Sequence, residues 1–99
     1  MPKRLEISHE AIKDLEEIWD YIAADNPNRA DQFIDEIYKK CREIARLDGV
    51  GRRRDELIPG LLSIPFRKKY LVFFLRTVKR VQIVRILHGA REIGGIFEA

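Results

Sequence analysis

The spacing of the apolar residues changes halfway along the chain, and this change restricts the fold more than any other feature of the sequence. Between residues 11 and 23, and again between residues 30 and 47, apolar side chains recur every three or four positions. That spacing is typical of amphipathic helices that bury one face. Beyond residue 51, apolar residues stand in short runs rich in β-branched and aromatic side chains, which predict strands. The chain must therefore pack a pair of helices on a sheet.

Polar residues and one proline mark where the two helices begin and end. Ser8 stands where a helix N-cap belongs, because its hydroxyl can accept a hydrogen bond from a free backbone N–H. Asp25-Asn26-Pro27 ends the first helix and begins the second, since proline cannot continue a helix but fits the first turn of a new one. Asp48-Gly49-Val50-Gly51 ends the second helix. The short connection predicts an antiparallel helical hairpin.

Short extended stretches on both sides of the hairpin predict the strands of one sheet. Leu5 and Ile7 alternate with charged residues near the N-terminus, and a basic loop at residues 52–56 follows the second helix. Three further strands are predicted at residues 61–66, 70–76 and 80–91. We expect residues 1–99 to form a single two-layer α+β domain, in which an N-terminal strand and a three-stranded antiparallel meander make one sheet.

The last predicted strand carries polar side chains among its apolar ones. Strict alternation gives one face to Val81, Ile83, Arg85 and Leu87, and the other to Gln82, Val84, Ile86 and His88. Neither face is wholly polar. We therefore expect a central strand, covered on one face by the fold and on the other by a further group such as a partner.

Four large side chains are the expected anchors of the core: Trp19, Phe33, Ile37 and Phe73. The first three lie on the apolar faces of the predicted helices, and the fourth lies in the most continuously apolar strand. Cys41 is the only cysteine, so a single chain can form no disulfide. Its place on an apolar helical face favours a buried residue over a nucleophile.

Charge is unevenly divided along the chain. Residues 1–48 hold eight Lys and Arg against twelve Asp and Glu, whereas residues 49–99 hold eleven against four. The strand-rich half is therefore basic, and a basic surface suits phosphates or an acidic peptide. The cations of this half that concern function, together with one histidine, are Arg52, Arg53, Arg54, Arg67, Lys68, Lys69, Arg76, Arg85, His88 and Arg91.

Two roles are open to this basic set. Arg85, His88 and either Lys68 or Lys69 could cleave RNA, since cations stabilise the charge on a reacting phosphate and a histidine moves protons near neutral pH. Alternatively, Arg85 and His88 pair with carboxylates of the helices or of a partner and cleave nothing. A single histidine without an obvious second acid or base favours the second interpretation.

The sequence has no glycine-rich phosphate loop, no histidine pair at metal-ligand spacing and no nucleophile elbow. We therefore expect neither a cofactor nor a metal ion. No apolar run has the length of a signal peptide or of a membrane span, and a lone cysteine suits a reducing compartment. The expected location is the cytoplasm, without membrane contact.

Several short motifs stand out when they are taken in chain order. They are Ile7-Ser8, Ala11, Asp14-Leu15, residues 18–23, Asn26-Pro27, Ala30, Phe33-Ile34, Gly51-Arg52, Arg54, Gly60-Leu61, Ser63, Pro65, residues 70–73 and residues 84–91. Together they resemble the ParE-type toxins of the RelE/ParE toxin–antitoxin superfamily over nearly the whole chain. The run Arg-Ile-Leu-His-Gly-Ala-Arg at residues 85–91 is the most characteristic of them.

The resemblance implies a toxin that binds DNA gyrase and traps it on cleaved DNA. It also implies a ParD-like ribbon-helix-helix antitoxin, which wraps the toxin with its C-terminal segment and binds DNA with its N-terminal part, in a heterotetramer or a larger complex. RelE-type relatives instead cut mRNA on the ribosome, and this function is the alternative. The residues expected to bind antitoxin or target are Arg52, Arg54, Tyr70, Arg76, Arg85, His88, Arg91 and Phe97.

The chain departs from the family pattern at three places. Leu62 stands where the family often has Arg, and Phe74-Leu75 stands where Tyr-Arg is common, so two cations and a hydroxyl are missing. Gly94-Gly95 replaces a less flexible stretch of the tail. We expect these departures to reduce or redirect toxicity.

Overall fold

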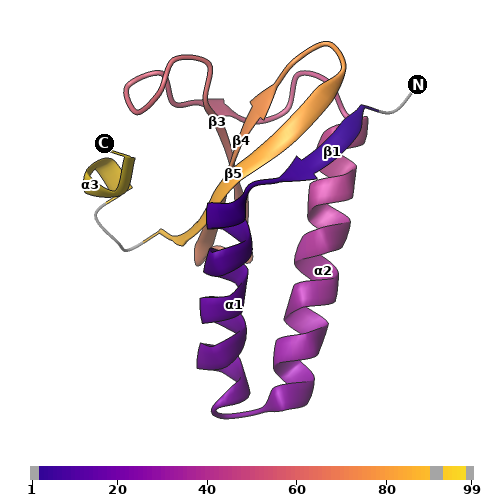
Figure 1. Ribbon diagram of the computed structural model, residues 1–99, viewed down its shortest axis with the longest axis vertical. Helices are drawn as coiled ribbons and strands as arrows, with labels where there is room; N and C mark the ends of the chain where they lie inside the picture. The colour runs from indigo at the N-terminus through magenta and orange to yellow at the C-terminus, as the bar shows by residue number, and fades with distance from the viewer. Residues whose placement is uncertain (1–2, 90–92, 98–99) are drawn as a thin grey trace.

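The computed structural model of the protein describes residues 3–89 and 93–97. Figure 1 shows two long helices as an antiparallel hairpin whose turn lies far from the sheet. This arrangement confirms the predicted order of strand, helical hairpin and further strands. In chain order the elements are β1 (Arg4–Ile7), α1 (His9–Ala23), α2 (Pro27–Arg46), β2 (Arg52–Arg53), β3 (Leu62–Phe66), β4 (Tyr70–Arg76), β5 (Arg80–His88) and α3 (Ile93–Phe97).

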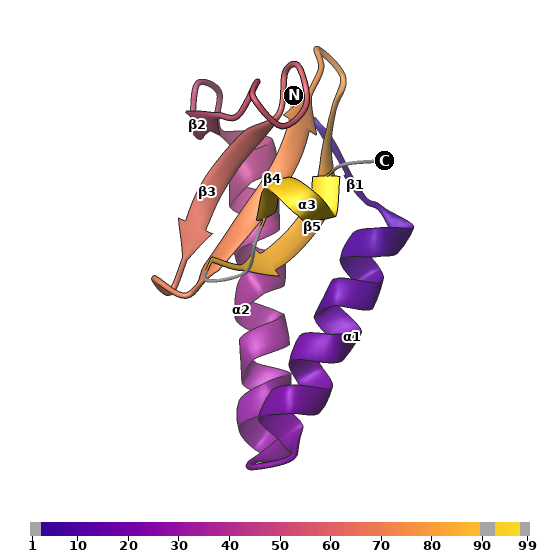
Figure 2. The ribbon, with the colours of Figure 1, turned by 90° about the vertical axis from the view of Figure 1, so that its left-hand side faces the viewer.

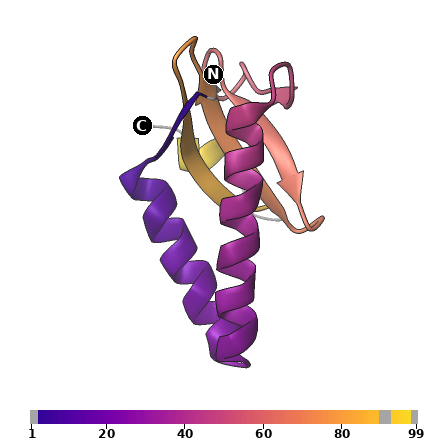
Figure 3. The ribbon, with the colours of Figure 1, turned by 90° about the vertical axis from the view of Figure 1, so that its right-hand side faces the viewer.

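One five-stranded sheet, in the order β1-β5-β4-β3-β2, forms the second layer. β1 pairs with β5 in parallel, whereas β5, β4, β3 and β2 pair with their neighbours antiparallel. Figures 2 and 3 show α1 and α2 on one face of this sheet and the short α3 on the opposite face. The predicted two-layer α+β architecture is therefore confirmed, and β5 is internal to the sheet as its apolar composition predicts.

Both long helices begin where their capping residues predict. The Ser8 hydroxyl accepts a hydrogen bond from Ala11 N–H at 3.0 Å and donates one to the Val84 carbonyl at 2.7 Å. The Asn26 side chain accepts a hydrogen bond from Arg29 N–H at 3.2 Å at the start of α2. Because the Ser8 hydroxyl accepts one hydrogen bond and donates another, it links the first turn of α1 to Val84, which lies 76 residues further along the chain.

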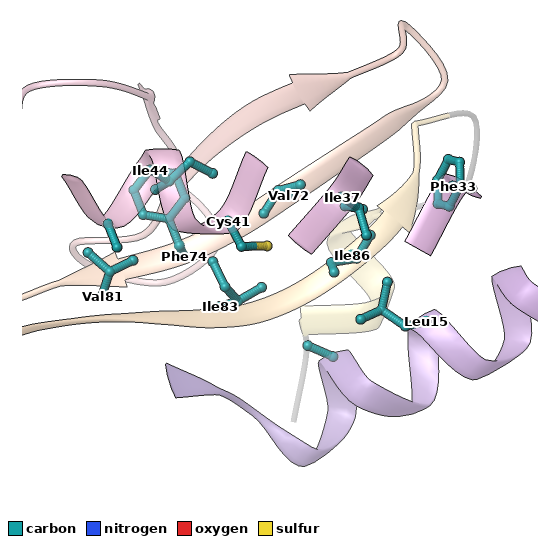
Figure 4. Close-up of a cluster of buried hydrophobic side chains, with 12 residues drawn as sticks. Leu15, Phe33, Ile37, Cys41, Ile44, Val72, Phe74, Val81, Ile83 and Ile86 are labelled. Atoms are coloured by element: carbon teal, nitrogen blue, oxygen red, sulfur yellow. The ribbon is translucent and has the colours of Figure 1, made fainter. Parts of the chain in front are cut away.

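The main core lies between the helical hairpin and the sheet (Figure 4), and a smaller cluster lies on the other sheet face. Phe33 and Ile37 belong to the main core, and Phe73 is fully buried in the smaller cluster, which α3 covers. The buried members of the main core are Ala11, Leu15, Phe33, Ile37, Cys41, Ile44, Ala45, Val72, Phe74, Val81, Ile83 and Ile86.

Trp19 is half-buried and belongs to neither cluster, so its prediction as a core anchor is corrected. Its indole Nε1–H donates a hydrogen bond to Asp31 Oδ1 on α2, at 2.8 Å. An indole N–H needs a hydrogen-bond acceptor, which an apolar core does not offer. The side chain therefore links the two helices near solvent and does not fill the space against the sheet.

Strand β5 contains one extra residue where it faces β4. Phe73 pairs with Arg85, but the next residue of β4, Phe74, pairs with Ile83. Val84 is therefore left without a partner of its own in the ladder, which is the geometry of a β-bulge. The carbonyl of this extra residue accepts the hydrogen bond from the Ser8 hydroxyl. The bulge thus forms where the start of α1 meets the strand.

The bulge changes which side chains of β5 share a face. Ile83 and Ile86 both pack in the main core, whereas Val84 and Leu87 pack in the cluster on the opposite face. Strict alternation along this strand, as predicted from the sequence, is therefore wrong beyond residue 83. An extra residue in one strand shifts every later side chain to the other face.

Two short elements differ from the sequence prediction. Arg52–Arg53, predicted as loop, forms β2 because it pairs with the first residues of β3. The tail forms α3, and the Phe97 ring lies 5.0 Å from that of Phe73. β5 ends at His88, and Arg91, in the predicted extension of this strand, lies outside the described residues. No helix in the described part of the chain has the length and apolarity needed to cross a membrane.

Candidate functional site

Asp14 of α1 lies against an edge of β5 that β1 leaves uncovered. The pairing of β1 with β5 ends at Ile83, so backbone N–H groups beyond it need other partners. Asp14 Oδ2 accepts a hydrogen bond from Ile86 N–H at 3.0 Å. The two carboxylate oxygens also accept hydrogen bonds from Nε and Nη2 of Arg85, each at 2.8 Å. One carboxylate thus fixes α1 to the strand.

This ion pair engages the guanidinium of Arg85. The Asp14 side chain is 6% exposed and that of Arg85 is 24% exposed. The hydrogen bonds from Arg85 to Asp14 raise the pKa of the guanidinium further, although burial acts in the opposite direction. The interpretation that Arg85 pairs with a carboxylate of the helices is confirmed. Its charge is therefore largely neutralised within the protein.

A cavity of about 310 Å³ lies beside this pair, between α1 and the neighbouring ends of β4 and β5. The rings of Tyr70 and His88 meet edge to face there, with centroids 5.5 Å apart. Burial, and secondly the nearby Tyr21, raise the pKa of Tyr70 above its usual value. The residues that line the cavity are Asp14, Glu17, Ile18, Tyr21, Lys69, Tyr70, Ile86 and His88.

A wider hollow of about 820 Å³ adjoins the cavity and shares Tyr21, Lys69 and Tyr70 with it. We call the cavity and the hollow together the groove. Tyr21 is 79% exposed, so the groove presents an aromatic ring to solvent. Exposed apolar surface next to polar groups marks sites of protein association. The other residues of the hollow are Ile22, Ala24, Asp25, Arg29, Gln32, Phe33 and Arg67.

The turn between β3 and β4 borders the groove and has a strained backbone. Arg67 and Lys68 have φ angles of 51° and 63°, in the left-handed region that side chains other than glycine rarely adopt. Arg67 is held by an ion pair with Glu36 of α2, and its guanidinium carbon lies 5.6 Å from the ring centroids of both Phe33 and Phe66. Strain that surrounding contacts maintain is a feature of binding sites.

The groove brings together part of the predicted site. Tyr70, His88 and Lys69 line it, and Arg85 lies next to it in the pair with Asp14. Lys68 is exposed in the bordering turn and does not line the cavity. Lys69, Tyr70, Arg85 and His88 come from two stretches of sequence, residues 69–70 and 85–88, which the antiparallel pairing of β4 with β5 brings together.

Arg54 and Phe97 lie on the opposite face of the sheet. The Arg54 guanidinium carbon is 5.6 Å from the centroid of the Phe73 ring, and its Nε donates a hydrogen bond to Ser63 Oγ at 3.1 Å. Phe97 contacts the same ring from α3. The sheet therefore separates Arg54 and Phe97 from the groove. Arg91, another predicted site residue, is outside the described residues.

Arg76 and Arg52, on β4 and β2, do not line the groove either. Arg76 Nη2 donates a hydrogen bond to the Ile44 carbonyl at 3.0 Å, and its guanidinium lies 5.6 Å from the Phe74 ring centroid. A cation at the last turn of a helix stabilises its unpaired carbonyls. Arg76 therefore has a structural role at the end of α2, whereas Arg52 is exposed on the edge strand β2.

Sequence reasoning missed Asp14, Glu17 and Tyr21 as residues of this site. A signal for Asp14 was present, because positions 11, 14, 15 and 18 share one helical face and three of them are apolar. A carboxylate inside an apolar stripe requires a buried partner. In residues 3–89 and 93–97, no three His, Cys, Asp or Glu side chains gather so as to hold a metal ion.

Comparisons with known proteins agree with the resemblance seen in the sequence. The family model described as the ParE toxin of the type II toxin-antitoxin system parDE matches residues 5–93. A solved structure titled "Chromosomal ParDE TA system from P. aeruginosa" superposes with a TM-score of 0.76 at 23% identity, over 87% of this chain and 95% of that one. This likeness confirms the fold. A search of curated protein sequences found no significant match.

Proposed function

Because this chain belongs to the ParE toxin family of type II toxin–antitoxin systems, we propose that it inhibits DNA gyrase in the cytoplasm and that a ParD-like antitoxin neutralises it. The family match over residues 5–93 carries the toxin assignment. The groove supplies the surface that a protein partner needs, since it is lined by polar and apolar side chains and presents an exposed tyrosine.

The Asp14–Arg85 pair favours a binding protein over the ribonuclease alternative. A phosphate transition state needs cations that are free to approach it. Arg85 is engaged by both oxygens of Asp14, and Lys68 stands outside the cavity. Of the proposed catalytic set, only His88 and Lys69 line the cavity. That set provides fewer free cations than the ribonuclease hypothesis requires.

For the antitoxin we propose an amphipathic, partly acidic segment that lies in the groove. Its apolar side chains would pack on Tyr21 and Tyr70, and its carboxylates would meet Lys69 and Arg29. Lys69 and Arg29 are suited to this, because neither makes an ion pair within the described part of the chain. Electrostatic complementarity of this kind mainly sets the specificity and the association rate.

A gyrase supercoiling assay with the purified toxin tests the proposed target. We expect loss of supercoiling and accumulation of cleaved DNA–gyrase complexes, both of which cognate antitoxin reverses. Primer extension on a translated mRNA, in a parallel reaction, tests the alternative. Unchanged supercoiling together with new mRNA cleavage sites would establish the ribonuclease in place of the gyrase inhibitor.

The placement of the antitoxin is tested separately by two groove variants, Tyr21→Ser and Lys69→Glu. Each is expected to weaken antitoxin binding by about tenfold, or ~1.4 kcal/mol, since aromatic and charged contacts dominate interfaces. Lys39→Glu is the matched control, because Lys39 is an exposed cation of α2 that does not line the groove. If all three variants bind the antitoxin as the unmodified protein does, the antitoxin lies elsewhere.

A further inference from the structure

A basic corner lies at the end of the sheet where β4 turns into β5. We define it by three cations, Arg4, Lys79 and Arg80, which surround a hollow of about 790 Å³ together with Thr77 and Val78. Figure 1 shows this turn at the opposite end of the molecule from the turn between α1 and α2. The groove described above contributes no residue to this hollow.

The parallel pairing of β1 with β5 forces these cations together. Arg4 and Arg80 are direct partners in the ladder, and Arg4 N–H donates a hydrogen bond to the Lys79 carbonyl at 2.9 Å. Neighbouring strands are about 4.8 Å apart, so three positive side chains start from adjacent backbone positions. Like charges placed side by side on neighbouring strands destabilise a sheet.

The protein compensates only part of this charge. Glu6 Oε2 accepts a hydrogen bond from Arg80 Nη1 at 3.1 Å. Among the residues that the structure describes, Arg4 and Lys79 form no ion pair. Two uncompensated cations therefore remain at the hollow, and both side chains are exposed. An anion that binds here would gain their attraction and relieve their mutual repulsion.

Hydrogen bonds close the turn of the hairpin that carries the corner, and its tip is exposed. Thr77 N–H donates a hydrogen bond to the Arg80 carbonyl at 2.8 Å, and Arg80 N–H donates one to Thr77 Oγ1 at 3.1 Å. Val78, at the tip, is 90% exposed. A two-stranded ribbon of this kind fits the major groove of duplex DNA, from which its cations can reach the phosphate backbone on either side.

From the uncompensated cations and the shape of the hairpin, we propose that the basic corner binds the backbone phosphates of duplex DNA. The contacts involve phosphates and no base-specific hydrogen bonds, so binding is independent of sequence. Strand β4 begins at Tyr70 in the groove and ends at Arg76 next to the hairpin turn. The corner and the groove therefore lie at opposite ends of one strand, and the toxin can hold DNA and a protein partner together.

The test is fluorescence anisotropy with the purified full chain and a labelled duplex of about 20 base pairs, between about 50 and 200 mM salt. No gyrase and no antitoxin are present, so the result is independent of the proposed function. The variant Arg4→Glu/Lys79→Glu changes two side chains that form no ion pair with any residue of 3–89 or 93–97. Lys13→Glu/Lys39→Glu is the matched control, since it makes the same change of charge at exposed positions of α1 and α2.

We expect the corner variant to bind at least about tenfold more weakly near 100 mM salt, and its log–log salt slope to fall by about 2, because each lost phosphate contact removes about 0.9. The control should retain at least half of the affinity. A duplex of unrelated sequence should bind equally well, and polyglutamate of equal charge should compete poorly.

Three outcomes would overturn the proposal. Equal weakening by both double variants would show that net charge alone attracts DNA. Equal competition by polyglutamate would show a general anion site without preference for the duplex. An unchanged affinity of the corner variant would place any DNA contact elsewhere. Arg4→Gln/Lys79→Gln, which removes the charges without adding new ones, should weaken binding in the same direction and guards against a folding defect of the Glu variant.

Discussion

Asp14 holds Arg85 through two hydrogen bonds of 2.8 Å, one to each carboxylate oxygen. The same carboxylate accepts the Ile86 N–H, which β1 is too short to reach. A side chain of α1 thus substitutes for a strand at the edge of β5. These hydrogen bonds join Asp14 to two residues that follow it by 71 and 72 positions in the chain. They orient α1 on the sheet, and they limit the ability of Arg85 to bind other groups.

Removing this carboxylate is expected to destabilise the fold. Asp14→Ala leaves a half-buried guanidinium and a buried N–H without their acceptor, which costs about 3 kcal/mol in the free energy of unfolding. Urea denaturation followed by circular dichroism measures it. Asp20→Ala, at an exposed position of the same helix, is the matched control and should cost less than about 1 kcal/mol. Similar losses for the two variants would contradict a special role for Asp14.

Ser8 is expected to contribute more to the free energy of unfolding than an ordinary helix cap does. Ser8→Ala removes the acceptor for Ala11 N–H and the donor to the Val84 carbonyl, so we expect a loss of about 2 kcal/mol. Asn26→Ala, which removes only one capping bond at an exposed site, should cost about 1 kcal/mol. Thermal unfolding of both variants measures the difference. If the cap of α2 proves the more costly to remove, the link from Ser8 to the bulge is unimportant.

The buried thiol of Cys41 is expected to lower the free energy of unfolding at alkaline pH. Burial raises its pKa from an ordinary 9.0 to about 11. Since the unfolded chain then loses the proton first, the contribution of the thiol to stability is complete below about pH 9 and is lost as the pH rises toward 11. Between these values, the stability of Cys41→Ala should fall less steeply than that of the unmodified protein in urea titrations. Parallel pH profiles would exclude this effect.

The two glycines of α3 are expected to weaken its docking over the second cluster. A Cβ added at Gly94 or Gly95 would meet no heavy atom within 4 Å, so Gly→Ala should stabilise the helix by about 0.5–1 kcal/mol at each position. Hydrogen exchange of the α3 amides should slow several-fold. Gly51→Ala is the contrasting control, because its φ of +104° and a Cβ only 2.9 Å from Phe74 Cζ predict destabilisation. Unchanged exchange in α3 would show that other contacts limit its docking.

Local sequence signals predicted the helices because each signal acts within one or two turns. Ser8 and Asn26 satisfy N–H groups three residues away, so the beginnings of α1 and α2 follow from the sequence alone. The apolar positions of α2 likewise predict its buried face, including Phe33 and Ile37. The order of β3, β4 and β5 was predictable for the same reason, since each run of β-branched and aromatic residues is continuous.

Features that depend on distant contacts were not predictable from local patterns. The bulge at Val84 lies where the start of α1 reaches the strand, and alternation within β5 contains no trace of that contact. The position of Asp14 within an apolar stripe indicates a buried partner, but nothing near it in the sequence identifies that partner as Arg85. Trp19 illustrates the reverse error: its size and spacing favour the core, but its N–H bonds to Asp31 near the surface.

The parallel pairing of β1 with β5 also determines when the sheet can finish folding during synthesis of the chain. β1 can pair only after β5 has been synthesised, and the helical hairpin and three other strands separate the two in the chain. At translation rates of roughly 5–20 residues per second, the hairpin emerges seconds before the strand that completes its cover. Until then the Asp14 carboxylate has no arginine, and β1 and β4 lack the strand that lies between them in the sheet. A nascent chain is therefore without its final sheet, and without its groove, until β5 has been made.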